Sequence, residues 1–257
     1  RDTLIINNGS EPETLDPNLM SGSIEGRVGS ELFEGLTRKH PRTLEPLPGV
    51  AMRWEAKDGF RRYIFSLRTN ARWSNGRTVT AHDFVWSWRR LLDPATGSRY
   101  AEFLYCLENG EAYNGGKLKD PALLGVRALD DFTLEVRLKQ PTPYFLEITS
   151  FYVTLPVPRE AVEKYGGQWT RPGNIIGNGP FRLREWHMHR RIILEKNPRY
   201  WARELVRLER VIFLPIQDDA AALNLYRAGD VDVLFSFPHE IHTLLRTKRD
   251  YNASQGW

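Results

Sequence analysis

The sequence predicts a mixed α/β protein, and three observations support this class. Apolar runs with strand spacing alternate along the chain with stripes at helical spacing. Turn signals such as Asp58-Gly59 and Asn75-Gly76 separate these segments. The chain has no internal repeat or low-complexity tract, and its 257 residues suffice for one or two domains with a sizeable core.

The N-terminal segment is predicted to run strand, loop, helix. Residues 3–7 have the composition of a buried strand. The loop "NNGSEPETLDP", residues 7–17, contains two prolines and too few apolar residues to be helix or core. Residues 23–36, "SIEGRVGSELFEGL", carry an apolar stripe at helical spacing, with Gly35 as a C-terminal stop. That stripe comprises Ile24, Val28 and Leu32.

Residues 37–80 are predicted to form strands around "YIFSL", residues 63–67, with the two Gly-containing turns between them. Thr80 and Asp83 have the spacing of a capping box, with Asp in place of Glu. This box opens a helix that Asp93-Pro94 ends. One side of that helix is apolar and comprises Phe84, Val85, Trp88, Leu91 and Leu92.

The next segment is predicted to be a flexible surface loop at residues 110–121, followed by a hairpin at 124–141 that turns at Asp130-Asp131. Proline pairs at 141/143 and 156/158 bracket a short helix, "YFLEITS". Closely spaced prolines stiffen a connection, so the second pair is interpreted as a crossover between domains.

The C-terminal third is predicted to alternate between helices and strands. The helices are placed at 159–167 and 218–228, with a further helix beginning at 238–240. The strands are placed at about 180–186, 190–196, 208–214 and 230–235.

Composition narrows the function classes. The single cysteine, Cys106, permits no internal disulfide, and no apolar run approaches the ~18 residues of a membrane helix. The net charge is +4, but basic and acidic residues are interleaved, and the densest basic cluster, His187–Arg191, is short. We therefore predict no nucleic-acid binding. The chain opens directly on a strand, so the protein is either cytosolic or has lost a leader.

The motifs of catalysis are missing from the sequence. It has no G-x-S-x-G elbow, and the phosphate-loop pattern near Gly116-Lys117 fails because position 111 is Glu. His187 and His189 lie two apart on a predicted strand, which favours an exposed face over a metal site that needs three or four ligands. His82 is interpreted as part of a helix cap and Cys106 as a small buried apolar residue. No catalytic residue, metal or cofactor is predicted.

Several segments resemble one family in order along the whole chain. They include "NNGSEPETLDP" with "ELFEGL", the tryptophan–turn–helix block from Trp73 to Pro94, and "NIIGNGPFRLREW". These segments are similar to the oligopeptide-binding proteins of bacterial ABC importers, extracellular solute-binding protein family 5. The oligopeptide branch fits better than the dipeptide or nickel branches.

The resemblance implies a periplasmic-binding-protein-like lobe, a mixed sheet flanked by helices, with an inserted smaller α+β domain. Residues 1–33 and 158–257 would form domain I, and residues 34–157 would form domain II. The opposing lobe, domain III, would follow residue 257. The chain is thus expected to be the first part of a longer protein that lacks its second lobe, with a naturally short gene product as the alternative.

The resemblance also implies where a peptide would bind. The backbone of Ser21-Gly22-Ser23 would pair with it as a neighbouring strand does, and the rigid loop before it would fix that edge in advance. Tyr100 matches an aromatic residue presented to the peptide, and Phe235-Ser236 matches a Tyr-Asn pair near it. Ser30 stands where close relatives carry arginine. The alternative for the loop is a well-capped turn with no ligand.

The implied function is that of an extracytoplasmic peptide receptor that delivers short peptides to an ABC permease. It would be a monomer if complete and not an enzyme, and a lipid anchor in a removed leader stays open. With one lobe, the chain is expected to bind peptides weakly. Two other classes stay open: a periplasmic peptidase and a standalone module that binds murein peptides.

Overall fold

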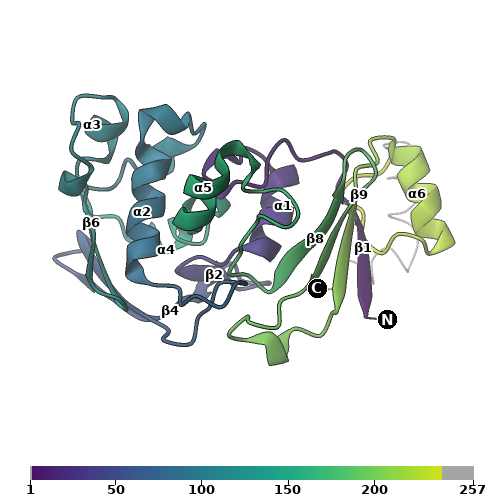
Figure 1. Cartoon of the computed structure of the whole chain (residues 1–257), viewed down its shortest axis with the longest axis horizontal. Helices are drawn as coiled ribbons and strands as arrows, with labels where there is room; N and C mark the ends of the chain where they lie inside the picture. Colours follow the sequence, from purple (N-terminus) through teal and green to yellow (C-terminus); the bar gives the residue numbers. More distant parts are fainter. Residues whose placement is uncertain (1, 239–257) are drawn as a thin grey trace.

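The computed structural model describes residues 2–238, and these form two four-stranded sheets near opposite ends of an elongated molecule (Figure 1). Helices α1 (Ser23–Leu32) and α5 (Arg159–Tyr165) lie between the sheets. None of the helices in residues 2–238 is long and apolar enough to cross a membrane.

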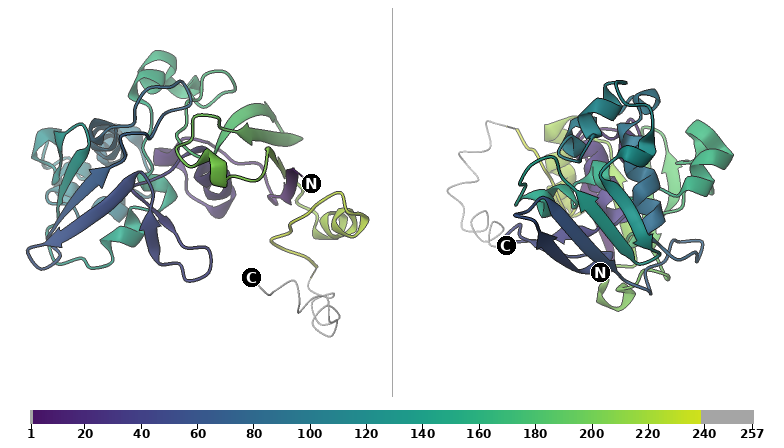
Figure 2. Two further views of the ribbon diagram at one scale, coloured as in Figure 1. Left: turned by 90° about the horizontal axis from the view of Figure 1, so that it is seen from below. Right: turned by 90° about the vertical axis from the view of Figure 1, so that its left-hand side faces the viewer.

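The first sheet joins the N-terminal strand to strands about two hundred residues later. Its order is β1 (Thr3–Asn7), β10 (Arg210–Leu214), β9 (Arg191–Lys196) and β8 (Phe181–His187). Strand β1 is parallel to β10, and the other pairs are antiparallel. Figures 1 and 2 both show the N-terminal strand beside these later strands. The prediction of a buried strand at 3–7 is wrong in one respect: β1 is an edge strand, and Thr3–Ile6 are only half-buried.

The second sheet is antiparallel and has the order β4 (Ala51–Lys57), β5 (Arg62–Leu67), β7 (Thr133–Arg137) and β6 (Val126–Asp130). The predicted hairpins at Asp58-Gly59 and Asp130-Asp131 are confirmed as its β4–β5 and β6–β7 turns. A two-stranded sheet, β2 (Thr37–Lys39) with β3 (Pro46–Pro48), lies between the larger sheets in sequence and in space.

Helix α2 (Ala81–Leu92) packs on β6, and its start was predictable from local chemistry. The Thr80–Asp83 capping box is present in both directions. Asp83 also accepts a hydrogen bond from Trp73 Nε1 at 3.2 Å and pairs with Arg77 Nη2 at 2.8 Å. The cap thereby fixes the preceding turn to the helix, which explains why this block of sequence folds as a unit.

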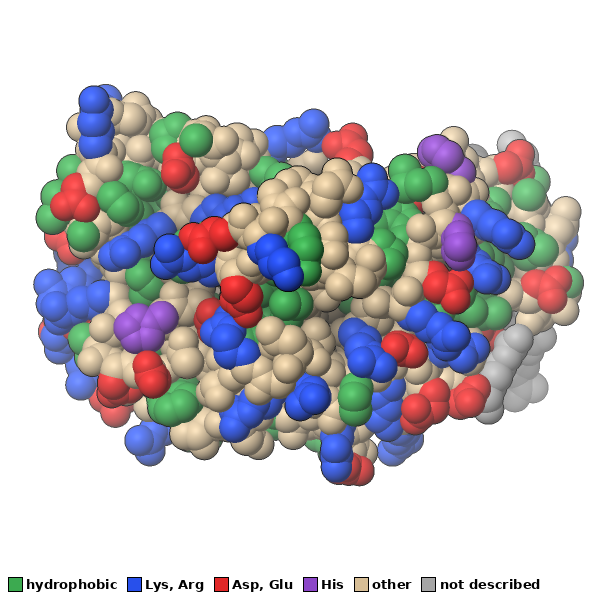
Figure 3. Space-filling view, viewed as in Figure 1, with side chains coloured by type: hydrophobic (Ala, Val, Ile, Leu, Met, Phe, Trp, Pro, Cys, Tyr) green, Lys and Arg blue, Asp and Glu red, His purple; other side chains and the backbone are tan. Residues whose placement is uncertain are grey.

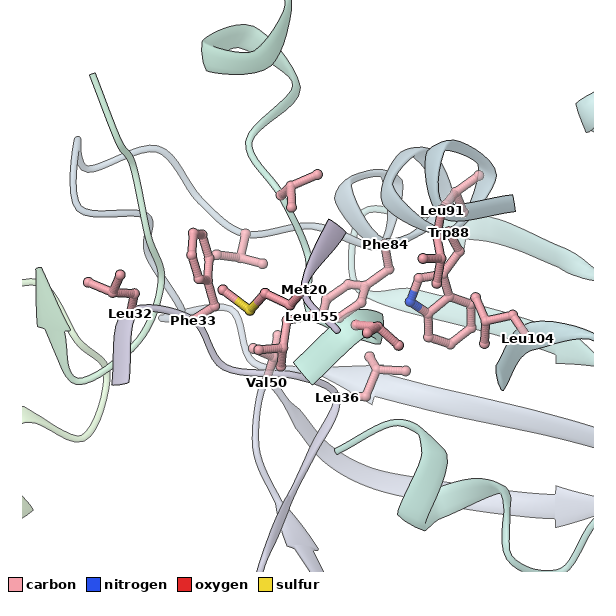
Figure 4. Close-up of a cluster of buried hydrophobic side chains, with 14 of the residues drawn as sticks. Met20, Leu32, Phe33, Leu36, Val50, Phe84, Trp88, Leu91, Leu104 and Leu155 are labelled. Atoms are coloured by element: carbon pink, nitrogen blue, oxygen red, sulfur yellow. The ribbon is translucent and has the colours of Figure 1, made fainter. Parts of the chain in front are cut away.

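One hydrophobic core runs through the molecule from α1 to α2. Figure 4 shows its central part, where side chains from the loop and helix near the N-terminus meet the apolar side of α2. The labelled members are Met20, Leu32, Phe33, Leu36, Val50, Phe84, Trp88, Leu91, Leu104 and Leu155, all of which are buried. The burial of several aromatic rings here supplies much of the hydrophobic driving force for folding.

Shorter elements complete the fold and correct three expectations. The segment predicted as a flexible loop contains α3 (Gly110–Asn114), because Tyr113 is buried against α2. Helix α1 ends at Leu32, not at Gly35; a side chain at Gly35 would come within 2.5 Å of the Thr149 carbonyl oxygen. The strand predicted at 230–235 is reduced to one bridge between Ile6 and Val233.

The remaining predicted helices are confirmed as α4 (Phe145–Ile148), α5 and α6 (Asp219–Ala228). Single 3₁₀ turns include η1 (Pro17–Leu19), η3 (Ala101–Leu104), η5 (Tyr152–Thr154) and η7 (Arg203–Leu205). The helix predicted to begin at 238–240 lies outside the described residues. All strands of the second sheet fall within residues 34–157, while the division into domains stays a prediction.

Candidate ligand groove beside helix α1

The opening loop is held rigidly between the first sheet and α1. Asn7 Oδ1 accepts hydrogen bonds from the amides of Gly9 and Ile216, both at 3.1 Å. Asn8 Nδ2 donates to the Ile24 carbonyl at 3.1 Å. A loop lacks the regular backbone hydrogen bonds of a strand or helix, and these side-chain hydrogen bonds take their place. The loop therefore has a defined conformation.

Asp16 is the main anchor of this loop. Its buried carboxylate pairs with Arg90 of α2 through both terminal nitrogens, at 2.9 and 2.6 Å. It also accepts hydrogen bonds from Trp169 Nε1 at 2.9 Å and from the Asn18 amide at 3.1 Å. A bidentate ion pair with two further donors satisfies the carboxylate fully, so Asp16 fixes the end of the loop to α2.

The chain just after this anchor is extended. Gly22 has φ −155° and ψ 173° and is the N-cap of α1. Tyr100 Oη donates to the Ser21 carbonyl at 2.8 Å, and Arg99 donates to Ser21 Oγ at 3.1 Å. Within residues 2–238, no hydrogen bond uses the amides of Ser21, Gly22 or Ser23. This backbone therefore has amide donors free for a strand-like partner, with the Ser21 and Gly22 amides directed to opposite sides of the extended chain.

An aromatic wall, defined as Tyr100, Phe103, Phe151 and Tyr152, stands beside this extended segment. Phe103 and Phe151 are stacked with ring centroids 4.4 Å apart, and Phe151 and Tyr152 are 4.2 Å apart. The Tyr152 ring lies against α1 at Gly26, where a Cβ would come within 2.6 Å of it. Burial and the neighbouring Tyr100 hydroxyl raise the pKa of Tyr152 to about 12, so the Tyr152 phenol stays a neutral donor near pH 7.

A hollow of about 400 Å³, here called the α1 groove, runs along the outward face of α1. Its walls are largely apolar. They comprise Ile6, Ser23, Gly26, Arg27, Ser30, Glu31, Tyr152, Phe213 and Phe235. The groove thus joins α1 to the first sheet, the aromatic wall and the segment after α6.

Arg27 is held in place inside this groove. Its Nη1 donates to the Asn8 carbonyl at 3.0 Å and to Asn8 Oδ1 at 2.8 Å. Its Nη2 donates to Ser23 Oγ at 3.3 Å, and its guanidinium lies 3.8 Å from the Phe235 ring centroid. Arg27 therefore connects the loop, α1 and Phe235.

A second hollow of about 290 Å³ adjoins the first, since both include Ser30 and Glu31. It also includes Glu34, whose buried carboxylate accepts hydrogen bonds from Tyr200 Oη and, at 2.6 Å, from Trp201 Nε1. Burial raises the pKa of Glu34, and these two donors oppose the shift. Asn178 binds the Glu34 backbone through both its amide atoms, at 3.0 and 2.9 Å.

The structure brings together five of the six residues predicted to contact a peptide. Ser23 and Phe235 line the α1 groove, and Tyr100 binds Ser21 beside Gly22. Ser236 differs, because its hydroxyl donates to Asp219 of α6 at 2.7 Å and it does not line the groove. Contact of these residues with a peptide stays a prediction.

Sequence reasoning missed Arg27, Glu31 and Asn178. The first two could have been found from helical spacing, since Ser23, Arg27, Ser30 and Glu31 fall on one stripe opposite the buried one. Asn178 gives no such signal, because its partner lies 144 residues away.

The histidines and the cysteine for which no catalytic or metal-binding role was predicted lie outside the α1 groove. His187 ends β8, and His189 lies in the following turn with φ 56°, so the expected shared strand face does not exist. His82 lies at 3.4 Å from Asp131 on the surface, and burial raises the pKa of Cys106 to about 11. Across residues 2–238, no cluster of His, Cys, Asp and Glu could hold a metal ion. On the face drawn in Figure 3, basic and acidic side chains are interspersed.

Comparison with known proteins gives consistent matches over nearly the whole chain. The family model of bacterial extracellular solute-binding proteins, family 5, matches residues 45–256. The periplasmic oligopeptide-binding protein OppA of Salmonella typhimurium is 44% identical over 249 residues, which are 96% of this chain and 45% of that protein.

Two solved structures are similar throughout the described fold. The Escherichia coli murein tripeptide binding protein MppA matches with a TM-score of 0.92 and 39% identity, covering 96% of this chain and 48% of that one. Haemophilus influenzae OppA in complex with RPPGFSPFR matches with a TM-score of 0.91 and 38% identity, covering 100% and 49%. The chain thus spans about half the length of these relatives.

Proposed function

The chain belongs to the bacterial extracellular solute-binding proteins of family 5, and on that premise we propose that it is a peptide-binding component of an ABC importer. In this role it binds short peptides outside the cytoplasm and passes them to a permease in the membrane. The S. typhimurium relative is an oligopeptide-binding protein, and the H. influenzae relative holds a nine-residue peptide. The family comprises binding proteins, not enzymes.

The fold supports this proposal. The predicted lobe of the periplasmic-binding-protein type is confirmed over the described residues by its likeness to two peptide-binding proteins. In the proposed arrangement, residues 1–33 and 158–257 form domain I, and residues 34–157 form the inserted domain II. The periplasmic relative also supports placement in the periplasm or an equivalent extracytoplasmic space. A monomer is the proposed working unit.

One observation carries the assignment of peptides as ligands. The amides of Ser21, Gly22 and Ser23, where the extended chain enters α1, have no partners in residues 2–238, and they lie beside the aromatic wall and the α1 groove. A peptide backbone can accept from these amides without any reading of its side chains, while the groove takes an alternate side chain. This arrangement suits a receptor for peptides of varied sequence.

The test removes one of these amides without disturbing the helix. Ser23 is the first residue of α1, a position where proline is favoured because the amide there has no intrahelical partner. We expect Ser23→Pro to keep the fold and to weaken peptide binding by about tenfold, as the loss of one backbone hydrogen bond predicts. Ser23→Ala keeps the amide and should bind as the parent chain does.

Binding is measured by native mass spectrometry of the 257-residue chain with a library of tri- to pentapeptides. Retained peptide adducts that weaken in Ser23→Pro alone support the proposal. A chain that stays bare at millimolar peptide contradicts it, as does equal binding by both variants.

A murein tripeptide belongs in the same library, because the E. coli relative of known structure binds one. Retention of the murein tripeptide with rejection of the standard tripeptides would favour the narrower function of murein-peptide binding.

A further inference from the structure

Glu31 occupies a distinctive place on the outward stripe of α1. It lines both the α1 groove and the adjoining hollow, so it lies where the two meet. Its side chain is half-buried, whereas Ser30 beside it is exposed. A ligand side chain that entered either hollow would therefore lie close to Glu31.

Three charged residues near Glu31 have polar partners, whereas Glu31 has none within the described residues. Arg27 donates to Asn8 and Ser23, and Glu34 accepts from Tyr200 and Trp201. Arg38 Nε donates to the Pro48 carbonyl at 3.1 Å. Within residues 2–238, the Glu31 carboxylate accepts no hydrogen bond and forms no ion pair.

A carboxylate in such surroundings is electrostatically incomplete. Burial removes part of its hydration, and nothing replaces the lost water. This burial raises the pKa of Glu31 to about 7. A cation that arrived with a ligand would restore the missing interaction.

We propose that Glu31 binds the cationic end of a lysine or arginine side chain of the bound peptide, so that the α1 groove prefers a basic residue at one ligand position. The inference rests on the proposed peptide-binding function. The walls fit this side-chain class, since Tyr152, Phe213 and Phe235 offer apolar surface to the aliphatic stem while the charged end reaches Glu31.

Lys39 is the internal competitor for this position. It lines the same hollow as Glu31, and its Nζ lies 6.0 Å from the Phe151 ring centroid. If Lys39 paired with Glu31 in solution, the carboxylate would already be neutralised and a ligand cation would gain little. The variant Lys39→Met removes this competitor and should leave the preference for a basic ligand unchanged or larger.

The test compares peptides that differ by one ammonium group. Lys-Ala-Ala, Ala-Lys-Ala and Ala-Ala-Lys are titrated at pH 8 against the same peptides with norleucine in place of lysine. We expect lysine to bind about tenfold more tightly than norleucine at one of the three positions, as a partly desolvated ion pair predicts. Glu31→Gln should abolish this difference.

Glu108→Gln is the matched control. Glu108 is also a carboxylate without a side-chain partner in residues 2–238, but it is exposed and lies between η3 and α3. This control should keep the full lysine preference. It separates the local effect of Glu31 from the loss of one unit of net charge.

The pH profile is a second readout. The groups that line the hollows around Glu31 are Arg27 on α1, Glu34, Arg38 and Lys39 on the following segment, Tyr152 on η5 and Tyr200 before η7. Because a cation binds the ionised carboxylate, the lysine preference should grow between pH 5.5 and 8.5 in the parent chain. It should be absent at every pH in Glu31→Gln.

The outcomes separate this inference from the proposed function. Equal binding of lysine and norleucine peptides at all positions, or an unchanged preference in Glu31→Gln, overturns the inference and leaves peptide binding intact. Failure of every peptide to bind overturns both.

Discussion

Asp16 and Glu31 are two acidic residues on either side of the Ser21–Ser23 segment, and their surroundings are opposite. Asp16 is buried and accepts hydrogen bonds from Arg90, Trp169 and the Asn18 amide. Glu31 is half-buried and accepts none within residues 2–238. The comparison teaches that a carboxylate with all its partners holds the scaffold together, while one without partners marks where a ligand can bind.

The largest expected effect comes from the satisfied carboxylate. Asp16→Ala leaves the Arg90 guanidinium and the Trp169 indole N–H without their acceptor in a buried site. We expect the free energy of unfolding to fall by about 4 kcal/mol. Urea denaturation followed by tryptophan fluorescence measures it.

Asp230→Ala is the control for this substitution, because Asp230 is exposed. It should change the free energy of unfolding by less than about 0.5 kcal/mol. Similar losses of unfolding free energy in the two variants would show that Asp16 contributes no more to stability than a surface acid. The contrast drawn between Asp16 and Glu31 would then be wrong.

The second expected effect is a gain in the free energy of unfolding, and it comes from Glu31→Gln. The pKa of Glu31 is 4.5 in the unfolded chain, its ordinary value, and about 7 in the folded chain. The folded state therefore loses stability as the pH rises from about 4.5 to about 7, and the loss is complete above that range. Glu31→Gln should stabilise the chain at pH 8 by on the order of 2 kcal/mol and have little effect at pH 4.

Urea denaturation at the two pH values checks this prediction, with Glu108→Gln as the exposed counterpart that should show no such pH dependence. A Glu31→Gln chain that is less stable than its parent at pH 8 would mean that the carboxylate has an internal partner. That result would also count against its role toward a ligand cation.

The smallest effect concerns the segment between the two acids. Tyr100→Phe removes the hydrogen bond of 2.8 Å to the Ser21 carbonyl but keeps the ring in the aromatic wall. We expect a loss of about 1 kcal/mol in the free energy of unfolding. Peptide affinity should fall a few-fold because the extended backbone is less well ordered before binding.

Tyr144→Phe serves as the matched change, since Tyr144 is exposed and far along the chain in the turn before α4. Thermal denaturation and peptide titration of both variants check the prediction. If Tyr100→Phe binds peptides as well as Tyr144→Phe does, the order of Ser21–Ser23 does not depend on this bond.

Much of the fold was predictable because its signals are local. The Thr80–Asp83 cap, the Asp58-Gly59 turn and the spacing of Phe84 and Trp88 each depend on residues a few positions apart. The errors arise where distant contacts decide. Strand β1 ends the four-stranded order because only a short segment at Asp232-Val233 pairs with its outer side. Helix α1 stops early because the chain at Gly35 packs tightly against Thr149.

The candidate site was only partly predictable for the same reason. Ser23 and Phe235 line one groove although they lie 212 positions apart, and only the family resemblance pointed to both of them; their contact with a peptide stays a prediction. The different states of Asp16 and Glu31 could not be predicted. The partners of Asp16 come from α2 and from the turn at Trp169, which are distant in sequence. The residues next to an acid in the sequence therefore do not indicate which groups will pair with it.

The parallel pairing of β1 with β10 also sets an order of events during synthesis on the ribosome. Thr3 pairs with Arg210, so the first strand leaves the ribosome long before its partner exists. At roughly 5–20 residues per second, this wait is on the order of 10–40 s. The second sheet, whose strands all lie between Ala51 and Arg137, can form during that time. Until β10 has been made, strand β1 therefore lacks its hydrogen-bonded neighbour, while the second sheet can already be complete.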